Sequence, residues 1–232
     1  MGKVLMSGIV PQLEAPCPPH DPVFANNDWE TIIKVCQANK VPDTWAVGDQ
    51  KTMTINGIEY HIDIIGKNHD TYADGSGKAP LTLQTHTTSV SALMASNGWK
   101  ESAARNTELP SVLLQMPIEV QSGIKEVKKI TSAGGLSSTL EETVDKLFFL
   151  SEIEILGTTT HSFAGEGTQY AYYAAGNTPI KNYSPSDASP YMYWTRSPDN
   201  SNSGFYCLIN DDGSATMSPA SAGARGAFAF CF

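Results

Sequence analysis

Apolar and polar positions alternate in two short stretches early in the chain, from Lys51 to Ile55 and from Ile58 to Ile65. Such alternation is typical of β-strands with one buried face. The two stretches are joined by Asn56-Gly57, the strongest short signal for a two-residue hairpin, so a β-hairpin is predicted here. Its predicted inward-facing residues are Met53, Ile55, Ile58, Tyr60, Ile62 and Ile64.

A helical spacing of apolar residues precedes this hairpin. Asn27 has a side chain suited to the N-cap, and the predicted helix ends near Asn39. The apolar residues that fall on its one face are Trp29, Ile32, Ile33 and Cys36.

The middle of the chain predicts short strands and helices between loops. Strands are expected at Leu81–Gln84, at Lys125–Ile130 as an exposed strand, and at Leu147–Leu150 as a buried one. The last is expected to run into a short helix that carries Glu152 and Glu154, a joint that anchors the core.

Loops and chain breaks separate these elements. Gly66 to Pro80 is predicted to be a polar loop, and the sequence TSAGGLSST a loop of small residues. Val90 to Gln121 is predicted to hold short helices interrupted at Pro110 and Pro117.

The C-terminal part shifts toward Ser, Gly, Asn, Ala, Tyr and Pro, with strand-like runs separated by turns. Asp211-Asp212-Gly213 is predicted to join two of these runs as a hairpin. The predicted strands are Met192–Ser197, Phe205–Asn210, Ser214–Ser218 and Ala224–Phe232.

The first 25 residues hold five prolines and little periodicity, which predicts an extended arm of the kind that packs on a neighbouring subunit. Residues 26–232 are then expected to form one domain. The N-terminal sequence has no sustained apolar region of the signal-peptide kind, so synthesis in the cytoplasm without a signal peptide is expected.

A net charge of -9 argues against nucleic acid as a partner, because phosphate binding relies on clustered Lys and Arg. The apolar runs are too short to predict membrane insertion. The cysteines have no metal-ligand spacing, and all four are interpreted as buried thiols. They are Cys17, Cys36, Cys207 and Cys231.

Candidate chemistry is sparse. His69-Asp70 could form a metal site or an acid–base pair, but a solvated loop is the favoured interpretation. Glu152 and Glu154 lie two apart on the expected helix and point to different faces, which favours a salt bridge or a cap over a glycosidase pair. Asn200 to Asp212 offers oxygen ligands for calcium, although its spacing matches no EF-hand. No catalytic residue, metal or cofactor is predicted.

One compositional feature rises above this background. Between Asp199 and Phe232 the chain has no Lys, Glu or Gln, whereas small hydrogen-bonding residues and aromatic residues are frequent. Antibody binding loops have a similar mixture, because aromatic side chains add contact area at little entropic cost. The alternative that composition leaves open is a turn-rich antiparallel sheet without a ligand.

The strings YWTRSP (193–198), FYCLINDDGSA (205–215) and GARGAFAFCF (223–232) resemble a family of C-type-lectin-fold domains found in phage, prophage and gut-bacterial proteins. Upstream segments from about Asn26 resemble phage members of that family. The resemblance implies an α+β fold with a mixed, mainly antiparallel sheet, two or more short helices and a loop-rich C-terminal half. The ending lacks the family's usual proline, and the motifs of calcium-dependent sugar-binding lectins are absent.

Some relatives in that family are hypervariable proteins of diversity-generating retroelements, in which a reverse transcriptase rewrites adenine-templated codons. The resemblance implies that residues 191–232 form a variable region, whose composition fits codons of this kind. Trp194, Arg196, Ser197, Pro198, Asp212, Gly213, Phe228 and Phe230 match the family's scaffold positions. A buried Arg196 then requires a carboxylate, for which Glu152 and Glu154 are the candidates.

The implied ligand-binding residues lie between these scaffold positions, and the expected function is receptor binding rather than catalysis. The expected protein is a tail-fibre or tail-tip component of a virion that is attached to other phage tail proteins and binds a host-cell surface protein or glycan. A homotrimer is the expected assembly. The alternatives are an oxidase similar to formylglycine-generating enzymes, and a virion decoration protein without a ligand. The expected ligand-binding residues are Asp199, Asn200, Asn202, Phe205, Tyr206, Asn210, Asp211, Ser214, Thr216 and Ser218.

Overall fold

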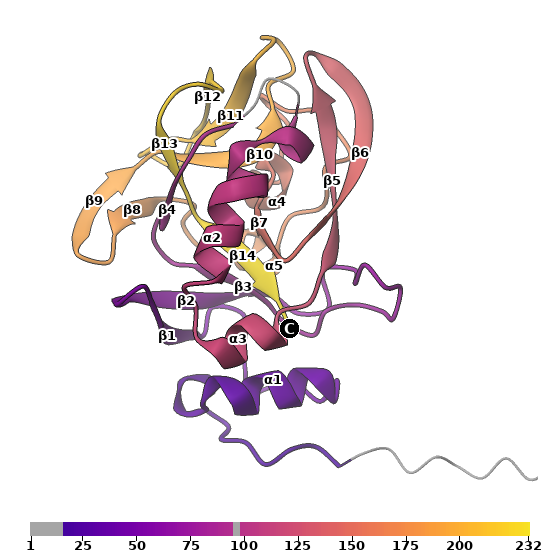
Figure 1. Ribbon diagram of the computed structural model, residues 1–232, viewed down its shortest axis with the longest axis vertical. Helices are drawn as coiled ribbons and strands as arrows, with labels where there is room; N and C mark the ends of the chain where they lie inside the picture. Colours follow the sequence, from indigo (N-terminus) through magenta and orange to yellow (C-terminus); the bar gives the residue numbers. More distant parts are fainter. Residues whose placement is uncertain (1–15, 95–97) are drawn as a thin grey trace, which may run out of the picture.

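The predicted hairpin around Asn56-Gly57 is confirmed and opens the first of two five-stranded sheets. The computed structural model describes residues 16–94 and 98–232. Asn56 and Gly57 have φ values of 49° and 77°, the positive values that a type I′ turn requires. The lower sheet has the order β1-β2-β3-β14-β7 (Figure 1), with every pairing antiparallel. Its strands are β1 (Gln50–Ile55), β2 (Ile58–Gly66), β3 (Thr82–Thr85), β7 (Leu147–Phe149) and β14 (Phe228–Cys231).

The alternation in this hairpin places most of the predicted residues inward. Met53, Ile55, Tyr60, Ile62 and Ile64 are all buried. The prediction is wrong for Ile58, which is 48% exposed because it adjoins the turn at the end of the hairpin.

The upper sheet is built mainly from the C-terminal strands that the sequence predicts. Its order is β12-β11-β10-β13-β4, and β10 pairs parallel with β13 while the other pairs are antiparallel. The fold is therefore α+β with mixed, mainly antiparallel sheets, as expected. The strands are β4 (Val90–Ala92), β10 (Tyr193–Pro198), β11 (Phe205–Ile209), β12 (Ala215–Pro219) and β13 (Ala224–Gly226).

The chain passes from the upper to the lower sheet between β13 and β14, at Ala227. In Figure 1 this yellow segment descends through the middle of the molecule. A Cβ atom built on Gly226 would lie 2.0 Å from Cζ of Phe149, so only glycine fits where the two sheets meet. The single predicted strand Ala224–Phe232 is thus two strands in different sheets.

Two further hairpins flank the sheets. The predicted loop TSAGGLSST instead forms the end of the hairpin of β5 (Val127–Gly134) and β6 (Ser137–Asp145), with only Gly135 and Leu136 in the turn. The strand predicted at 125–130 is confirmed from Val127 onward, but its predicted exposure is wrong, because Val127 and Lys129 are buried. The unpredicted hairpin of β8 (Lys181–Ser184) and β9 (Asp187–Tyr191) projects from the body (Figure 1).

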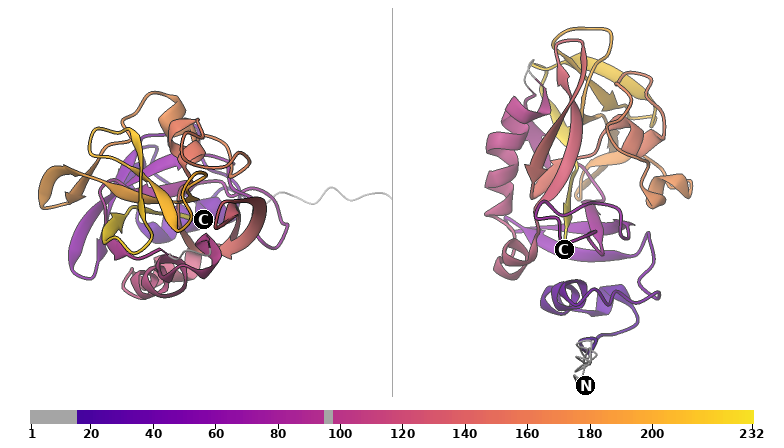
Figure 2. Two further views of the ribbon diagram at one scale, coloured as in Figure 1. Left: turned by 90° about the horizontal axis from the view of Figure 1, so that it is seen from above. Right: turned by 90° about the vertical axis from the view of Figure 1, so that its right-hand side faces the viewer.

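The first helix, α1 (Trp29–Gln37), buries the predicted apolar face but has a different cap. The Asp28 carboxylate accepts a 2.7 Å hydrogen bond from the backbone N–H of Thr31. Asn27 is buried instead, and its amide donates to the carbonyls of Asp21 and Val23. α1 lies at the lower end of the molecule in Figure 1 and in the right-hand view of Figure 2.

Pro110 does not interrupt the helical region as predicted. A π-helical turn, η3 (Ala104–Glu108), runs directly into α2 (Leu109–Leu113), and Pro110 lies in the first turn of α2, where its missing N–H needs no partner. Pro117, by contrast, stands at the start of a new helix. The other helices are η1 (Phe24–Asn26), η2 (Trp99–Glu101), α3 (Ile118–Gly123), α4 (Glu152–Leu156) and α5 (Ala171–Ala174).

The predicted arm of residues 1–25 lies partly outside the described residues, which begin at 16. Its described end packs on the chain's own domain. Trp45 donates from its indole to the carbonyl of Asp21 at 3.0 Å, and Phe24 is 1% exposed. The domain therefore begins near His20, whose ring lies 5.5 Å from that of Trp45.

Candidate ligand-binding surface

The strand β10, which carries the string YWTRSP, is buried along its whole length. Trp194 is anchored by a 3.0 Å hydrogen bond from its indole N–H to the carbonyl of Ala92. Tyr193 donates to the carbonyl of Pro179 at 2.7 Å. These scaffold positions hold the middle of the upper sheet and are inaccessible to a ligand.

Arg196 is a fully buried cation at the centre of this strand. Its guanidinium forms a two-pronged pair with Glu154, with N–O distances of 2.5 and 2.8 Å. The remaining N–H groups donate to the Thr131 hydroxyl and to the backbone carbonyls of Phe149, Ile130 and Glu166. The predicted carboxylate partner is thus present, and of the two candidates it is Glu154.

Glu154 also pairs with a second buried cation, Lys129 of β5, at 2.8 Å. Lys129 makes a 2.7 Å ion pair with Asp70 and receives Tyr170 as a further polar neighbour at 3.1 Å. Asp70 is therefore not part of a solvated loop, and that prediction is wrong. Its carboxylate accepts from the hydroxyls of Thr82 and Tyr170 because the loop after β2 folds inward here.

The two carboxylates in this cluster are held in their charged form. Burial would raise the pKa of Glu154, but the charges of Arg196 and Lys129 outweigh it and lower that pKa. Burial opposes ionisation of Asp70 in the same way, and Lys129 outweighs it, so the pKa of Asp70 lies well below its ordinary value. The cluster of two cations and two anions is neutral and ties β5, α4 and β10 together.

Glu152 and Glu166 fasten the loops around β10. Glu152 accepts hydrogen bonds from the backbone N–H groups of Thr160 and His161 and from the Ser162 hydroxyl. Glu166 accepts from the Ser197 hydroxyl and from a backbone N–H of β5, while burial raises its pKa. The expected structural role of the α4 carboxylates, as salt bridge and cap, is confirmed, because Glu154 also closes a capping box with Ser151.

Most of the sequence-predicted ligand-binding residues lie at the surface of the β11–β12 end of the upper sheet. Asn210 to Ser214 form the predicted turn, in which Gly213 has a φ of 85° and Asp212 accepts hydrogen bonds from Ser214. The predicted residues that are exposed or half-buried are Asn200, Asn202, Phe205, Asn210, Asp211, Ser214, Thr216 and Ser218.

Two predicted ligand-binding residues are buried instead. Tyr206 is 1% exposed, and its ring packs edge-on to Trp194 with centroids 6.3 Å apart. Asp199 is also 1% exposed, and its carboxylate accepts from the backbone N–H groups of Ser201 and Asn202 at 2.9 and 2.6 Å. Both residues shape the surface without being available to a ligand, so assigning them to contact was wrong.

A groove at the opposite edge of the same sheet was missed by the sequence analysis. It has a volume of about 430 Å³ and lies between the β8–β9 hairpin and strands β4 and β13. Tyr183 and Tyr191 meet edge-on at 5.0 Å, and the Arg225 guanidinium lies 4.5 Å from the Tyr183 ring. The signal available in the sequence was the run NYSPSDASPYMY, whose tyrosines flank turn-forming Ser, Pro and Asp.

The cysteines give no support to the oxidase alternative. All four are free thiols, and Cys207 and Cys231 are buried in different sheets. Burial raises the pKa of both thiols well above its ordinary value, which disfavours the reactive thiolate. Cys36 is buried as predicted, whereas Cys17 is exposed, contrary to the prediction.

Within residues 16–94 and 98–232, no group of three or more His, Cys, Asp or Glu side chains is arranged to hold a metal ion. Over the same residues, no helix has the length and apolar character needed to cross a membrane.

Comparison with known proteins places the chain in a family without giving it a function. The family described as "Domain of unknown function (DUF6273)" matches residues 81–230. That stretch includes the whole upper sheet and most of the buried charge cluster. No curated protein and no solved structure matches the chain.

Proposed function

The chain belongs to the family described as "Domain of unknown function (DUF6273)", and we propose that its C-terminal sheet is a receptor-binding surface of the C-type-lectin type. The ligand is a protein or glycan on the surface of a bacterial host, and the protein is a component of a phage tail. We propose further that a retroelement diversifies the exposed positions of this surface.

The observation that carries this proposal is the sharp division of residues 199–221 into buried anchors and small exposed side chains. Asp199 and Tyr206 are locked in place, whereas the side chains that face solvent are short Asn, Asp, Ser and Thr groups with Phe205 and Met217 among them. A rigid frame that displays variable small residues can change its specificity without changing its fold. Ser and Asn are also frequent in the binding loops of antibodies.

The Tyr183–Arg225 groove extends the proposed surface to the other edge of the sheet. Tyrosine and arginine are the residue types most enriched among those that dominate binding energy at interfaces. The groove and the β11–β12 end are parts of one sheet, so one ligand of protein size could contact both. Several copies on one virion, for example in a homotrimer, would multiply weak contacts.

The direct test exchanges only the eight exposed or half-buried positions defined above between relatives, leaving Asp199 and Tyr206 unchanged. Binding of the fluorescent protein to a panel of intact bacterial strains is measured by flow cytometry. We expect the strain preference to follow the exchanged residues. The matched control replaces exposed residues on the outer side of the β1–β2 hairpin, such as Thr54, Glu59 and His61, and should leave the preference unchanged.

Two outcomes would contradict the proposal. A strain preference that stays with the frame after the exchange would remove the β11–β12 end as the recognition surface. Complete absence of cell binding by every variant would favour a decoration protein. The retroelement proposal is tested by sequencing the DNA around the gene. We expect a repeat that is nearly identical to the 3′ end of the gene, differs from it only at adenines, and lies beside a reverse transcriptase gene.

A further inference from the structure

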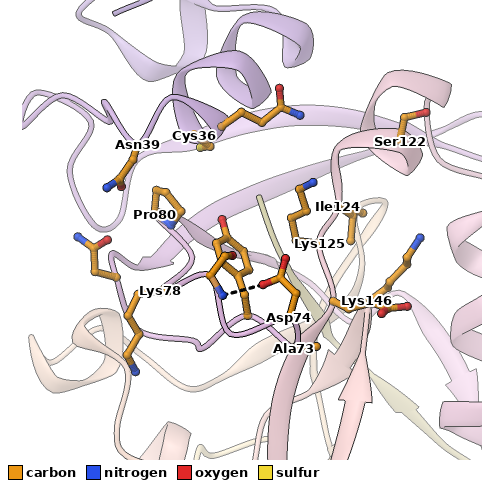
Figure 3. Close-up of a pocket in the computed structure, with 16 residues that line it drawn as sticks. Cys36, Asn39, Ala73, Asp74, Lys78, Pro80, Ser122, Ile124, Lys125 and Lys146 are labelled. Carbon is orange, nitrogen blue, oxygen red and sulfur yellow. Dashed lines mark hydrogen bonds between the residues drawn. The ribbon is translucent and has the colours of Figure 1, made fainter. Parts of the chain in front are cut away.

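A large polar cleft lies at the lower end of the molecule, away from the proposed receptor-binding surface. Its volume is about 920 Å³, within the range of small-molecule sites. Figure 3 shows the side chains around it, which come from the end of α1, the loop after β2, the segment before β5 and the β6–β7 connection. Figure 1 places α1 and this loop in the lower half and β11–β12 at the top.

The cleft gathers positive charge on an acidic chain. Lys78, Lys125 and Lys146 line it against two carboxylates, Asp74 and Glu126, although the whole chain carries 15 basic and 24 acidic residues. Within the described residues, the ammonium groups of Lys125 and Lys146 form no hydrogen bond or ion pair, whereas Lys78 donates to the carbonyl of His69 at 2.8 Å. Two cations are therefore free to meet a ligand.

Asp74 keeps its negative charge, because hydrogen bonds from Ser76 and the nearby charge of Lys125 lower its pKa, and its carboxylate is also engaged in its own loop. It accepts a 2.9 Å hydrogen bond from the backbone N–H of Ser76, drawn as the dashed line in Figure 3. Three lysines and two carboxylates thus line the cleft, which leaves a net positive charge of one on its lining.

The rest of the lining offers hydrogen-bonding groups above an apolar floor. The side-chain amides of Gln37, Asn39 and Asn68 make no hydrogen bond with another described residue. Each amide can both donate and accept, which suits a ligand with several hydroxyl groups. Pro80 and Ile124 are buried beneath them.

The wall of the cleft is fixed by the C-terminal segment of the fold. The Tyr72 hydroxyl donates to the backbone carbonyl of Phe232 at 2.9 Å, so the ring is held in one position. Burial raises the pKa of Tyr72 to about 12, and the hydroxyl stays a donor at neutral pH. A preformed wall lowers the entropic cost of binding.

We propose that this cleft binds a hydroxyl-rich anion of saccharide size, with Lys125 and Lys146 contacting its carboxylate or phosphate and the amides contacting its hydroxyls. The proposal is independent of the receptor-binding function, since none of these residues lies in the upper sheet.

The test measures binding of three probes by isothermal titration calorimetry and by amide chemical shifts: N-acetylneuraminic acid, glucose 6-phosphate and neutral glucose. We expect at least one acidic probe to bind with a Kd below about 10 mM and glucose to bind more weakly. Binding of only one acidic probe would identify the anionic group. The amide signals of Ala73, Ser76 and Lys125 should shift, and those of Asn210 and Ser214 should not.

The test variant is the double substitution Lys125→Gln/Lys146→Gln, and the matched control is Lys100→Gln. Lys100 is exposed, lies outside the cleft, and its ammonium group has no partner among the described residues. All are surface changes, so the fold is checked by the thermal midpoint. We expect the double variant to weaken acidic-probe binding about five- to tenfold and the control to leave it unchanged. Raising the NaCl concentration should weaken wild-type binding.

The proposal is overturned if neither acidic probe binds, if glucose binds equally well, or if Lys100→Gln weakens binding as much as the double variant. Host-cell binding by the double variant separates the two hypotheses. If the double variant still binds host cells but no longer binds the acidic probe, the two sites are separate. If it also loses host-cell binding, the cleft is not independent of the receptor-binding surface.

Discussion

Glu154 is the residue on which two buried cations depend, since it contacts both Arg196 and Lys129. Replacing it by Gln removes the negative charge and leaves an uncompensated positive charge in the core. We expect Glu154→Gln to lower the free energy of unfolding by about 3–5 kcal/mol, measured by urea denaturation. The control is Glu142→Gln, whose exposed partner Lys128 lies at 3.0 Å and whose loss should cost no more than about 0.5 kcal/mol. Equal losses would contradict a special role for the buried cluster.

The same cluster predicts sensitivity to acid. The folded-state pKa values of Asp70 and Glu154 are lowered, so their contribution to stability is present above the ordinary carboxyl pKa, about 4, and is lost as the pH falls below it. Glu166 acts in the opposite sense, because its folded-state pKa is raised and its contribution is lost as the pH rises.

We therefore expect the free energy of unfolding to fall steadily below about pH 4, because Asp70 and Glu154 take up protons there while Glu166, with its raised pKa, titrates at higher pH. Urea denaturation between pH 2 and 6 checks this. In the Glu166→Gln variant, the fall in the free energy of unfolding below about pH 4 should remain, whereas the contribution of Glu166 to the pH dependence should disappear. A pH-independent stability of the wild-type protein would show that the cluster is not the acid-sensitive element.

Some residue roles were predictable from sequence, and others depended on tertiary pairing. A buried Arg196 requires a carboxylate wherever it lies, which is why its pairing with the α4 glutamates could be anticipated. Asp70 and Lys129 are 59 positions apart, and nothing local distinguishes either from a solvated charge. Likewise, burial of Asp199 and Tyr206 depends on the packing of neighbouring loops and not on their residue types.

At the scale of elements, the sharpest constraint is the passage of the chain between sheets at Gly226. Because an added methyl group would collide with the Phe149 ring, we expect Gly226→Ala to lower the free energy of unfolding by about 1–3 kcal/mol. Gly223→Ala is the matched control, since a Cβ there meets nothing within 4 Å. Thermal unfolding of the two variants provides the comparison, and similar midpoints would mean that the ring can move aside.

Elements with strong local signals were predictable, and those without them were not. The Asn-Gly hairpin, the buried strand that enters α4, and the Asp-Asp-Gly turn each carry a signal within a few residues. The β5–β6 and β8–β9 hairpins consist largely of Ser, Thr, Lys, Glu and Pro on their outer sides, so their alternation is hidden. Only Gly226 marks the division of residues 224–232 between two sheets in the sequence. The need for glycine at this position is explained by the Phe149 ring, which is a tertiary neighbour.

For the molecule as a whole, the structure predicts that the surface residues of the β11–β12 end and the buried residues beneath them respond differently to substitution. We expect the combined replacement of Asn210, Ser214, Thr216 and Ser218 by Ala to change the free energy of unfolding by no more than about 1 kcal/mol, because surface substitutions are usually nearly neutral. Tyr206→Ala, in the same strand pair, should cost about 3–5 kcal/mol as a large buried aromatic. Urea denaturation measures both, and comparable losses would argue against a separable display surface.

The position of β14 in the middle of the lower sheet has a consequence for protein synthesis. Residues 228–231 are made after the whole candidate surface, yet β3 and β7 pair with them and not with each other. A frameshift or stop codon within residues 199–223 therefore removes a central strand as well as the altered surface. We therefore expect frameshifted or truncated copies to fail to fold and to become substrates for proteolysis, whereas copies with in-frame substitutions keep β14.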